Sequence, residues 1–192
     1  MSVERIRVRA ATKADVRGIH ALVAIGTLRG HLLPRTAAEI RAHLGRWIVA
    51  RQGRRVVGCL ALEPTEPTLW EVRSVCVAED YRHHGVGQRL MGTARRRARR
   101  AGVPRLFAVT AAVPFFHDAG FAHVPPGARE WSFVLRPIRP DYQVMVQDLG
   151  AVTAQPADAP LLATGAWSSH AEAHIGQLGS QRRLHHGLVA LA

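Results

Sequence analysis

The chain has 192 residues, of which 47% are hydrophobic and 21% are charged. This length fits one domain, and the composition excludes a disordered polyelectrolyte, so at least part of the chain folds around a core. The formal net charge is +12, and Lys13 is the only lysine. The excess of guanidinium groups favours anionic partners, with a solvated arginine-rich surface as the alternative.

Membrane and metal partners are not predicted. No apolar run approaches the roughly 20 residues needed to cross a bilayer, and the N-terminus lacks the apolar core of a secretory signal, so we expect a cytoplasmic protein. Cys59 and Cys76 have no CxxC spacing, which predicts neither a disulfide framework nor a zinc site. Both lie in apolar runs, which indicates buried thiols.

The chain begins with a strand followed by two helices. In order we expect a strand at 6–10, a helix at about 13–25, a loop at 29–35 and a helix at about 37–45. Thr12 and Asp15 have the spacing of a capping box, and Thr36 caps the second helix. The loop at 29–35 is basic and rich in turn residues, which makes it a candidate binding loop.

An antiparallel meander and a strand-helix-strand unit follow. The predicted elements are strands at 47–51, 55–62 and 70–77, a proline-broken loop at 63–67, a helix at about 88–101 and a strand at 106–110. The order from 77 to 110 requires a parallel strand pair with a right-handed crossover. We therefore expect an α+β layer fold.

The domain closes with a short helix and two strands. The helix at 113–119 turns Phe115 and Phe116 inward and ends at Gly120, and strands at 121–124 and 131–135 form the closing pair. Beyond residue 137, prolines, alanines and glycines replace the apolar periodicity. We expect a domain at 1–137 and a largely disordered tail at 138–192.

Residues 82–88 have the form of a phosphate-binding loop. They lie between a predicted strand and the first turn of a predicted helix, where unpaired amides and the helix dipole attract an anion. Gly85 and Gly87 allow a close backbone approach, and Arg82 adds a full positive charge. The loop lacks the lysine of a Walker motif and the three glycines of a dinucleotide fingerprint.

These residues resemble the acetyl-CoA loop of the GNAT acyltransferase superfamily. Arg82-His83-His84-Gly85-Val86-Gly87 is similar to its R/Q-x-x-G-x-G/A motif, the stretch 70–77 to its central strand, and 115–121 to its FFxxxGF corner. The resemblance covers about residues 5–136. It implies a mixed, mostly antiparallel sheet with a splayed parallel strand pair, flanked by helices, and transfer of an acetyl group from acetyl-CoA to a primary amine by direct attack.

Within that superfamily, the chain is most similar to the acetyltransferase domain of N-acetylglutamate synthases. The shared segments are Leu-Leu-Pro-Arg at 32–35, Val-Val-Gly-Cys-Leu-Ala-Leu at 56–62 and Glu-Val-Arg-Ser at 71–74. This similarity implies glutamate as the acceptor, in arginine biosynthesis. The segment 111–114 lacks the glutamate common before the paired phenylalanines, so another amine stays open: a protein N-terminus, a polyamine or an antibiotic.

The resemblance also implies which residues bind the coenzyme. The main chain of Val75, Cys76 and Val77 would pair with the pantetheine arm. The pyrophosphate would lie on the loop residues Arg82, His83, His84, Gly85, Val86, Gly87 and Gln88. No metal takes part, the partners are CoA and a small-molecule amine, and a homodimer is left open.

Several residues are candidates for catalysis or acceptor binding. Glu71 could remove a proton from the amine, although it could instead pair with Arg73, which shares its strand face. His117 is a second candidate base, with a solvated histidine as the alternative. Arg35 and Arg73 could grip an acceptor carboxylate. Phe116 replaces the tyrosine acid of many relatives, so no general acid is assigned; a thiol with a pKa of about 8.5 leaves without one.

Other interpretations remain at this point. Strict alternation turns Cys76 away from Glu71, which favours a packing role for Cys76 over a nucleophile. Five arginines between 95 and 100 are interpreted as a solvated helix face. The +12 charge would also suit nucleic acid, but no reading module is present. A domain that binds acyl-CoA without catalysis is the third alternative.

Overall fold

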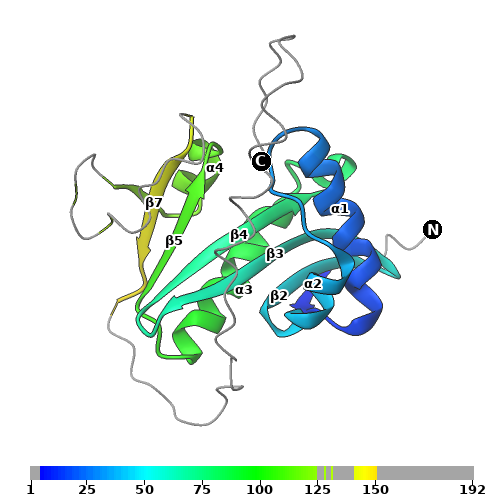
Figure 1. Cartoon of the computed structure of the whole chain (residues 1–192), viewed down its shortest axis with the longest axis horizontal. Coiled ribbons are helices and arrows are strands. Elements are labelled where there is room, and N and C mark those ends of the chain that lie inside the picture. Colours follow the sequence, from blue (N-terminus) through cyan, green and yellow to red (C-terminus); the bar gives the residue numbers. More distant parts are fainter. Residues whose placement is uncertain (1–4, 125–127, 129–130, 132–140, 151–192) are drawn as a thin grey trace.

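The computed structural model describes residues 5–124, 128, 131 and 141–150 (Figure 1). Its strands are β1 (Arg7–Ala10), β2 (Trp47–Gln52), β3 (Arg55–Glu66), β4 (Leu69–Val77), β5 (Arg105–Thr110), β6 (Ala122–His123) and β7 (Gln143–Asp148). Its helices are α1 (Val16–Leu28), α2 (Ala37–Ala42), α3 (Val86–Arg100) and α4 (Val113–Asp118), with 3-10 turns η1 (Lys13–Asp15), η2 (Leu44–Arg46) and η3 (Glu79–Tyr81).

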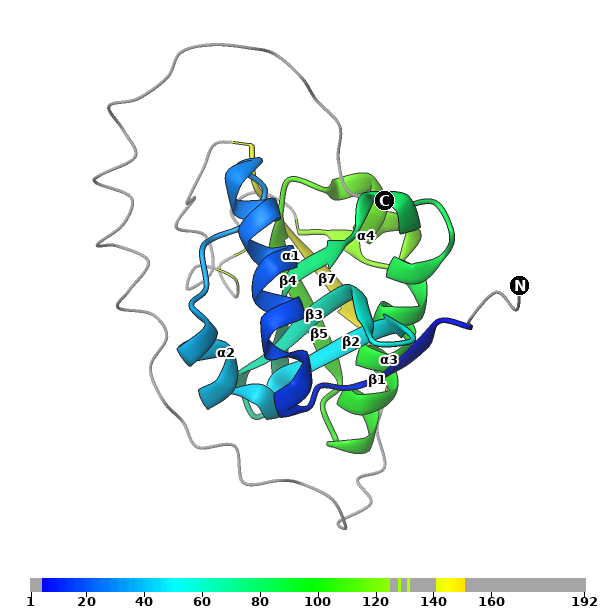
Figure 2. The ribbon, with the colours of Figure 1, turned by 90° about the vertical axis from the view of Figure 1, so that its right-hand side faces the viewer.

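In this part of the chain, the strands form a seven-stranded sheet in the order β1-β2-β3-β4-β5-β7-β6. The β4–β5 pair is parallel, and the other neighbours are antiparallel. In Figure 2, α1 and α2 cover one face of the sheet and α3 covers the other. The predicted α+β fold, a mostly antiparallel sheet with one parallel pair between layers of helices, is confirmed.

Alternate residues of β3 fill the two cores between these layers. Leu60 and Leu62 pack with Leu90 of α3, whereas Cys59 and Ala61 pack with the apolar side of α1. This alternation is the two-residue period of a strand that is buried on both faces. Polar side chains further along β3 that share a face with Cys59 and Ala61 therefore lie on the side of the sheet that α1 and α2 cover.

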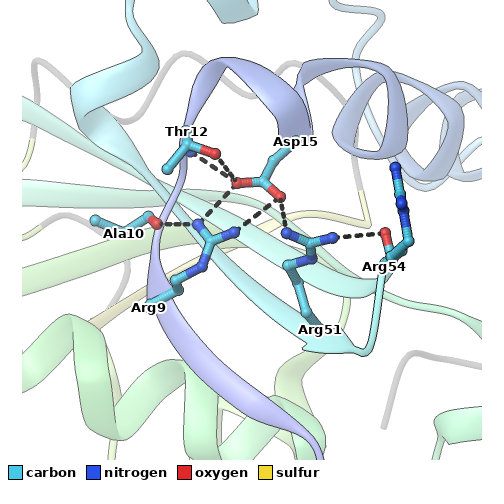
Figure 3. Close-up of polar contacts among 6 residues, drawn as sticks. All are labelled: Arg9, Ala10, Thr12, Asp15, Arg51 and Arg54. Carbon is cyan, nitrogen blue, oxygen red and sulfur yellow. Dashed lines mark hydrogen bonds and ion pairs between the residues drawn. The ribbon is translucent and has the colours of Figure 1, made fainter.

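Asp15 anchors the start of α1 through a fully buried carboxylate (Figure 3). It accepts hydrogen bonds from Thr12 N at 2.7 Å and from Arg9 Nη1 at 2.8 Å, and Arg51 Nη1 lies 3.4 Å from its second oxygen. Burial acts to raise the pKa of Asp15, but the hydrogen bonds from Arg9 and Thr12 outweigh it and lower that pKa. The predicted capping box of Thr12 and Asp15 is present. The Asp15 carboxylate also links the start of α1 to β1 through Arg9 and to β2 through Arg51.

The arginines of α3 do not form a simple solvated face. Arg95 donates to the carbonyl of Ala119 at 2.8 Å, Arg97 donates to Gly45 O, and Arg99 Nε donates to Leu149 O at 3.4 Å. Burial lowers the pKa of Arg97. The predicted solvated face was wrong for Arg95 and Arg97, which are half-buried because their long aliphatic stems lie along the protein and carry the guanidinium groups to carbonyls of other elements. Arg99 is exposed, as predicted.

The structure also corrects one predicted loop and one predicted strand pair. Strand β3 continues to Glu66 through most of the expected loop, and Pro64 pairs with Trp70 beside a register irregularity, where a strand tolerates proline. The partner of β6 is β7, not the predicted strand at 131–135, of which only Trp131 lies among the described residues. The predicted boundary near residue 137 therefore falls before the last strand of the sheet. Residues 151–192 of the expected tail lie outside the described residues.

Candidate functional site

Strands β4 and β5 start as neighbours and then separate. Their parallel register runs from Leu69 opposite Arg105 to Glu71 opposite Phe107. Beyond that point β5 stays paired with β7, β4 stays paired with β3, and Figure 1 shows β4 and β5 diverging. Within the described residues, the β5 side of Val75–Val77 has no ladder partner, so the main chain there could pair with an extended ligand.

A β-bulge at Ser74 bends β4 at the start of this separation. Ser74 has a φ of 51°, and the register shifts between the pairs Ala61 with Arg73 and Cys59 with Cys76. A bulge inserts one residue and therefore reverses the alternation that follows it. Cys76 consequently lies on the α1 side of the sheet with Cys59. The prediction that Cys76 faces away from Glu71 was wrong for this reason.

The Cys76 thiol packs against α1. Its Sγ donates a hydrogen bond to Leu22 O at 3.4 Å, and the side chain is buried. Burial raises the pKa of Cys76, which keeps the thiol protonated near neutral pH. These contacts favour the packing role that the sequence suggested over a nucleophile.

The loop at 82–88 leads into α3 without a side-chain cap. The N-cap is Gly85 in the left-handed conformation, with a φ of 71°, and the first turn of α3 contains no acidic residue. The first amides of an uncapped helix lack intrahelical acceptors, and the dipole adds about half a positive charge there. Arg82 precedes this turn and donates from Nε to Val77 O at 3.4 Å. The arrangement can bind a phosphate group.

The two glycines of this loop have different structural roles. Gly85 adopts a φ that L side chains rarely adopt, and the space where its Cβ would lie is open, with no atom within 4 Å. At Gly87 a Cβ would lie 2.7 Å from Cε2 of Phe115, so this glycine lets α3 approach α4 closely. The sequence predicted close approach at both positions, and at Gly87 the approaching group is the Phe115 ring.

The remaining predicted loop residues differ in their exposure: His83 and His84 are exposed, Gln88 is half-buried and Val86 is buried. His83 has a positive φ of 60°, and His84 donates from Nδ1 to Arg82 O at 2.5 Å. Gln88 lies in the first turn of α3, whereas Val86 is buried in the core under it. The side chains of His83 and His84 and the main chain at Gly85 are therefore the exposed parts of this segment.

A polar pocket lies on the α1 and α2 side of the sheet, next to the bulge. It is lined by Arg35, His43, Arg46, Trp47, Ala61, Glu63, Arg73 and Ser74. Arg35 comes from the loop between α1 and α2, which the sequence marked as a binding loop. Arg73 and Ser74 come from β4 where it leaves β5, so the pocket lies at the point where the two strands separate.

Charged pairs dominate this pocket. Arg46 forms an ion pair with Glu63, and Arg73 Nε lies 3.5 Å from Glu71 Oε1. Burial and the neighbouring charge of Arg73 lower the pKa of Arg35 to about 10. Burial raises the pKa of Glu71, with Arg73 opposing this effect and Glu63 adding to it. The guanidinium groups of Arg35, Arg46 and Arg73 thus lie close to the carboxylates of Glu63 and Glu71, and the charge of Glu39 also acts on Arg35.

The structure brings some predicted site residues together and leaves others apart. Arg35, Arg73 and Glu71 lie at or beside the pocket, and the predicted alternative pairing of Glu71 with Arg73 is present. His117 lies on α4 with 78% of its side chain exposed, 3.8 Å from Asp118. Phe116 is buried, with its ring edge-on to those of Phe115 and Phe121.

Sequence reasoning missed His43, Arg46, Glu63 and Ser74 of the pocket lining. Glu63 follows Ala61 by two residues, so extending the predicted strand past 62 would have placed it on this face. Nothing in the sequence marks the bulge at Ser74. Among the described residues no cluster of histidine, cysteine and acidic side chains could hold a metal ion, and none of the helices is long and apolar enough to cross a membrane.

Comparison with known proteins assigns the chain to a family. The profile of the Acetyltransferase (GNAT) family matches residues 23–121, just over half of the chain. The amino-acid acetyltransferase of Aeromonas salmonicida is 29% identical over 115 residues, which are 59% of this chain and 26% of that protein. The chain thus spans about a quarter of the length of that relative.

Two solved structures share the fold. The N-acetylglutamate synthase of Neisseria gonorrhoeae, complexed with coenzyme A and N-acetyl-glutamate, has a TM-score of 0.65 at 24% identity, covering 76% of this chain and 35% of that one. Rv2747 of Mycobacterium tuberculosis, in complex with CoA and NLQ, has a TM-score of 0.64 at 25% identity, covering 74% of this chain and 98% of that one.

Proposed function

The chain belongs to the acetyltransferase (GNAT) family and uses acetyl-CoA to acetylate an amine, and from this premise we propose that its acceptor is an amino acid. The observation that carries the proposal is the pair Arg35 and Arg73, which line one pocket where β4 and β5 separate. A planar guanidinium grips a carboxylate in two places. Likeness to amino-acid acetyltransferases supports the same class. Within it, the segments at 32–35, 56–62 and 71–74 that resemble N-acetylglutamate synthases favour glutamate, and hence arginine biosynthesis.

The structure offers acetyl-CoA a suitable surface. We assign the diphosphate to the main-chain amides of the loop at 82–88, because the α3 N-terminus is uncapped and the space over Gly85 is open. We assign the pantetheine arm to the β5 side of Val75–Val77, which has no ladder partner among the described residues. The coenzyme supplies the activated acetyl thioester.

The proposed reaction is direct attack of the acceptor amine on the thioester carbonyl. A carbon–nitrogen bond forms, the carbon–sulfur bond breaks, and CoA leaves as a thiolate. One proton must leave the amine, and a main-chain amide steadies the oxyanion of the tetrahedral intermediate. The burial of Phe116 agrees with departure of the thiolate without a tyrosine acid at that position.

Glu71 is the base that we propose, because it lies beside Arg73 at the pocket while His117 is exposed on α4. A base acts only when ionised, so the raised pKa of Glu71 predicts that kcat/KM increases as pH rises through that pKa. Glu71→Gln should lower kcat by about 100-fold and remove this inflection. Initial rates between about pH 5 and 9 measure both, with exposed Glu66→Gln as the control. An unchanged profile in Glu71→Gln, with a loss of rate in His117→Ala, would assign the base to His117 instead.

The acceptor class is tested by pairing each amino acid with the amine that lacks its α-carboxylate, for example L-glutamine with 4-aminobutanamide. We expect the amino acid to be the better substrate. Arg35→Gln should raise the KM of the amino acid by about 10- to 100-fold, because a charge-assisted contact is lost, and should leave the KM of acetyl-CoA unchanged. Release of CoA thiol is the measurement. Arg41→Gln is the matched control, since Arg41 is exposed on α2.

Preference for amines without a carboxylate, unchanged by Arg35→Gln, would contradict the amino-acid proposal and favour a polyamine or another amine. Acetyl-CoA binding with no turnover of any amine would favour a binding module instead. The panel should include L-glutamate, because N-acetylglutamate synthases are among the relatives of known fold.

A further inference from the structure

Glu63 is the one carboxylate in the lining of the pocket, within the part of the chain that the structure describes. It lies on β3 directly opposite Glu71 of β4 in the antiparallel register. The Glu71 carboxylate interacts with Arg73. Arg73 lines the pocket, and Glu71 is not among the lining residues. A ligand in the pocket would therefore meet Glu63 before Glu71.

Arg46 fixes the position of the Glu63 carboxylate. Arg46 belongs to η2, its side chain is only 7% exposed, and it forms an ion pair with Glu63 Oε1. A carboxylate has about four lone-pair sites on its two oxygens, so one such partner leaves acceptor capacity for a second donor. The pair is nearly buried, and this makes the carboxylate oxygens a fixed feature of the pocket wall.

The pocket consequently has groups of both signs held in fixed places. Arg35 and Arg73 supply positive charge from the α1–α2 loop and from β4, and Glu63 supplies negative charge from β3. The charges of Glu63 and Arg73 are near enough to influence the pKa of Arg35 in opposite directions. An amino acid is a zwitterion, whose ammonium and carboxylate need one anionic and one cationic partner a few ångströms apart.

We propose that Glu63, held by Arg46, binds the amino group of the acceptor in its ammonium form, while the guanidinium groups of Arg35 and Arg73 bind the carboxylate. This assignment rests on the proposed function and adds to it the residue that recognises the reacting nitrogen. Glu63 is thereby a binding residue common to all acceptors, whereas Arg35 discriminates between amino acids and simple amines. Glu71 keeps the separate role of base.

The test is the pattern of effects of Glu63→Gln and Arg35→Gln on matched substrates. Glu63→Gln should raise the KM of both L-glutamine and 4-aminobutanamide by about tenfold, because each loses the contact to its ammonium group. Arg35→Gln should raise the KM of L-glutamine alone. Neither variant should change the dissociation constant of acetyl-CoA, which calorimetry measures and which also shows that the variant is folded.

The double variant Arg46→Gln/Glu63→Gln guards against unfolding, because it replaces the ion pair with two amides and leaves no unpaired buried charge. It should show the same loss of about tenfold for both substrates. The assignment is overturned if the single or the double variant binds acetyl-CoA and keeps the wild-type KM for 4-aminobutanamide, or loses affinity for L-glutamine only. Failure of the wild-type protein to acetylate any amine would instead refute the proposed function, and with it this assignment.

Discussion

Gly85→Val is expected to weaken acetyl-CoA binding by at least about 100-fold while the protein stays folded. Gly85 has a φ of 71° and no atom within 4 Å of the position of a Cβ. The valine side chain would project into the open space over the first amides of α3, where we place the diphosphate. Its strain in the left-handed region should destabilise the fold by only about 1–2 kcal/mol. Calorimetric titration with acetyl-CoA and thermal unfolding measure the two effects separately.

Gly53→Val is the matched control for this variant. Gly53 also has a positive φ, of 53°, but it lies in the turn between β2 and β3. The two variants should lose similar stability, and only Gly85→Val should lose acetyl-CoA affinity. Equal affinities in the two variants would show that the diphosphate does not lie over Gly85.

Asp15→Asn is expected to lower the free energy of unfolding by about 3 kcal/mol. Asp15 is fully buried and interacts with Arg9 and Arg51, so the neutral amide leaves two guanidinium groups without their shared counter-charge. It also weakens the cap that Thr12 and Asp15 form at the start of α1. Urea denaturation near neutral pH measures the change.

The loss should depend on pH in a defined direction. The pKa of Asp15 is lowered in the folded protein, so its contribution is complete above its ordinary pKa of 3.8 and disappears as pH falls through the lower folded pKa. The difference between wild type and Asp15→Asn should shrink as pH falls below about 4. Asp80→Asn is the control, because Asp80 is 77% exposed and lies 3.9 Å from Arg55. Equal losses in both variants would contradict the role of Asp15.

The loop at 82–88, to which we assign the coenzyme diphosphate, could be predicted from sequence because its signal is local. A strand, a basic turn with Gly85 and Gly87, and a helix follow one another within a few residues, and the structure has them in that order. The parallel pairing of β4 and β5 was likewise implied by the strand-helix-strand order. Arg35 and Arg73 meet at one pocket because the predicted binding loop covers the predicted central strand.

The rest of the site depends on features that local patterns do not encode. Pro64 and Pro67 indicated a loop, so Glu63 was not assigned to a strand face, although β3 continues past it. The bulge at Ser74 reverses the alternation of β4, and no residue type in the sequence marks it. The prediction therefore assigned Cys76 to the wrong face of the sheet. Strand β7 pairs with β5 at long range, and its sequence lies beyond the change in composition near residue 137.

The central claim is that the loop at 82–88 binds the diphosphate of acetyl-CoA, and calorimetry with two ligands tests it most directly. Acetyl-CoA and S-acetyl-pantetheine carry the same thioester and pantetheine arm, but S-acetyl-pantetheine lacks the diphosphate and the adenosine 3′-phosphate attached to it. The difference in affinity is assigned to the loop when Gly85→Val, which blocks only the space over the loop, removes it. We predict saturable binding of acetyl-CoA, and binding of S-acetyl-pantetheine that is weaker by at least about 100-fold. Equal affinity for the two ligands, or no binding of acetyl-CoA, would contradict the account.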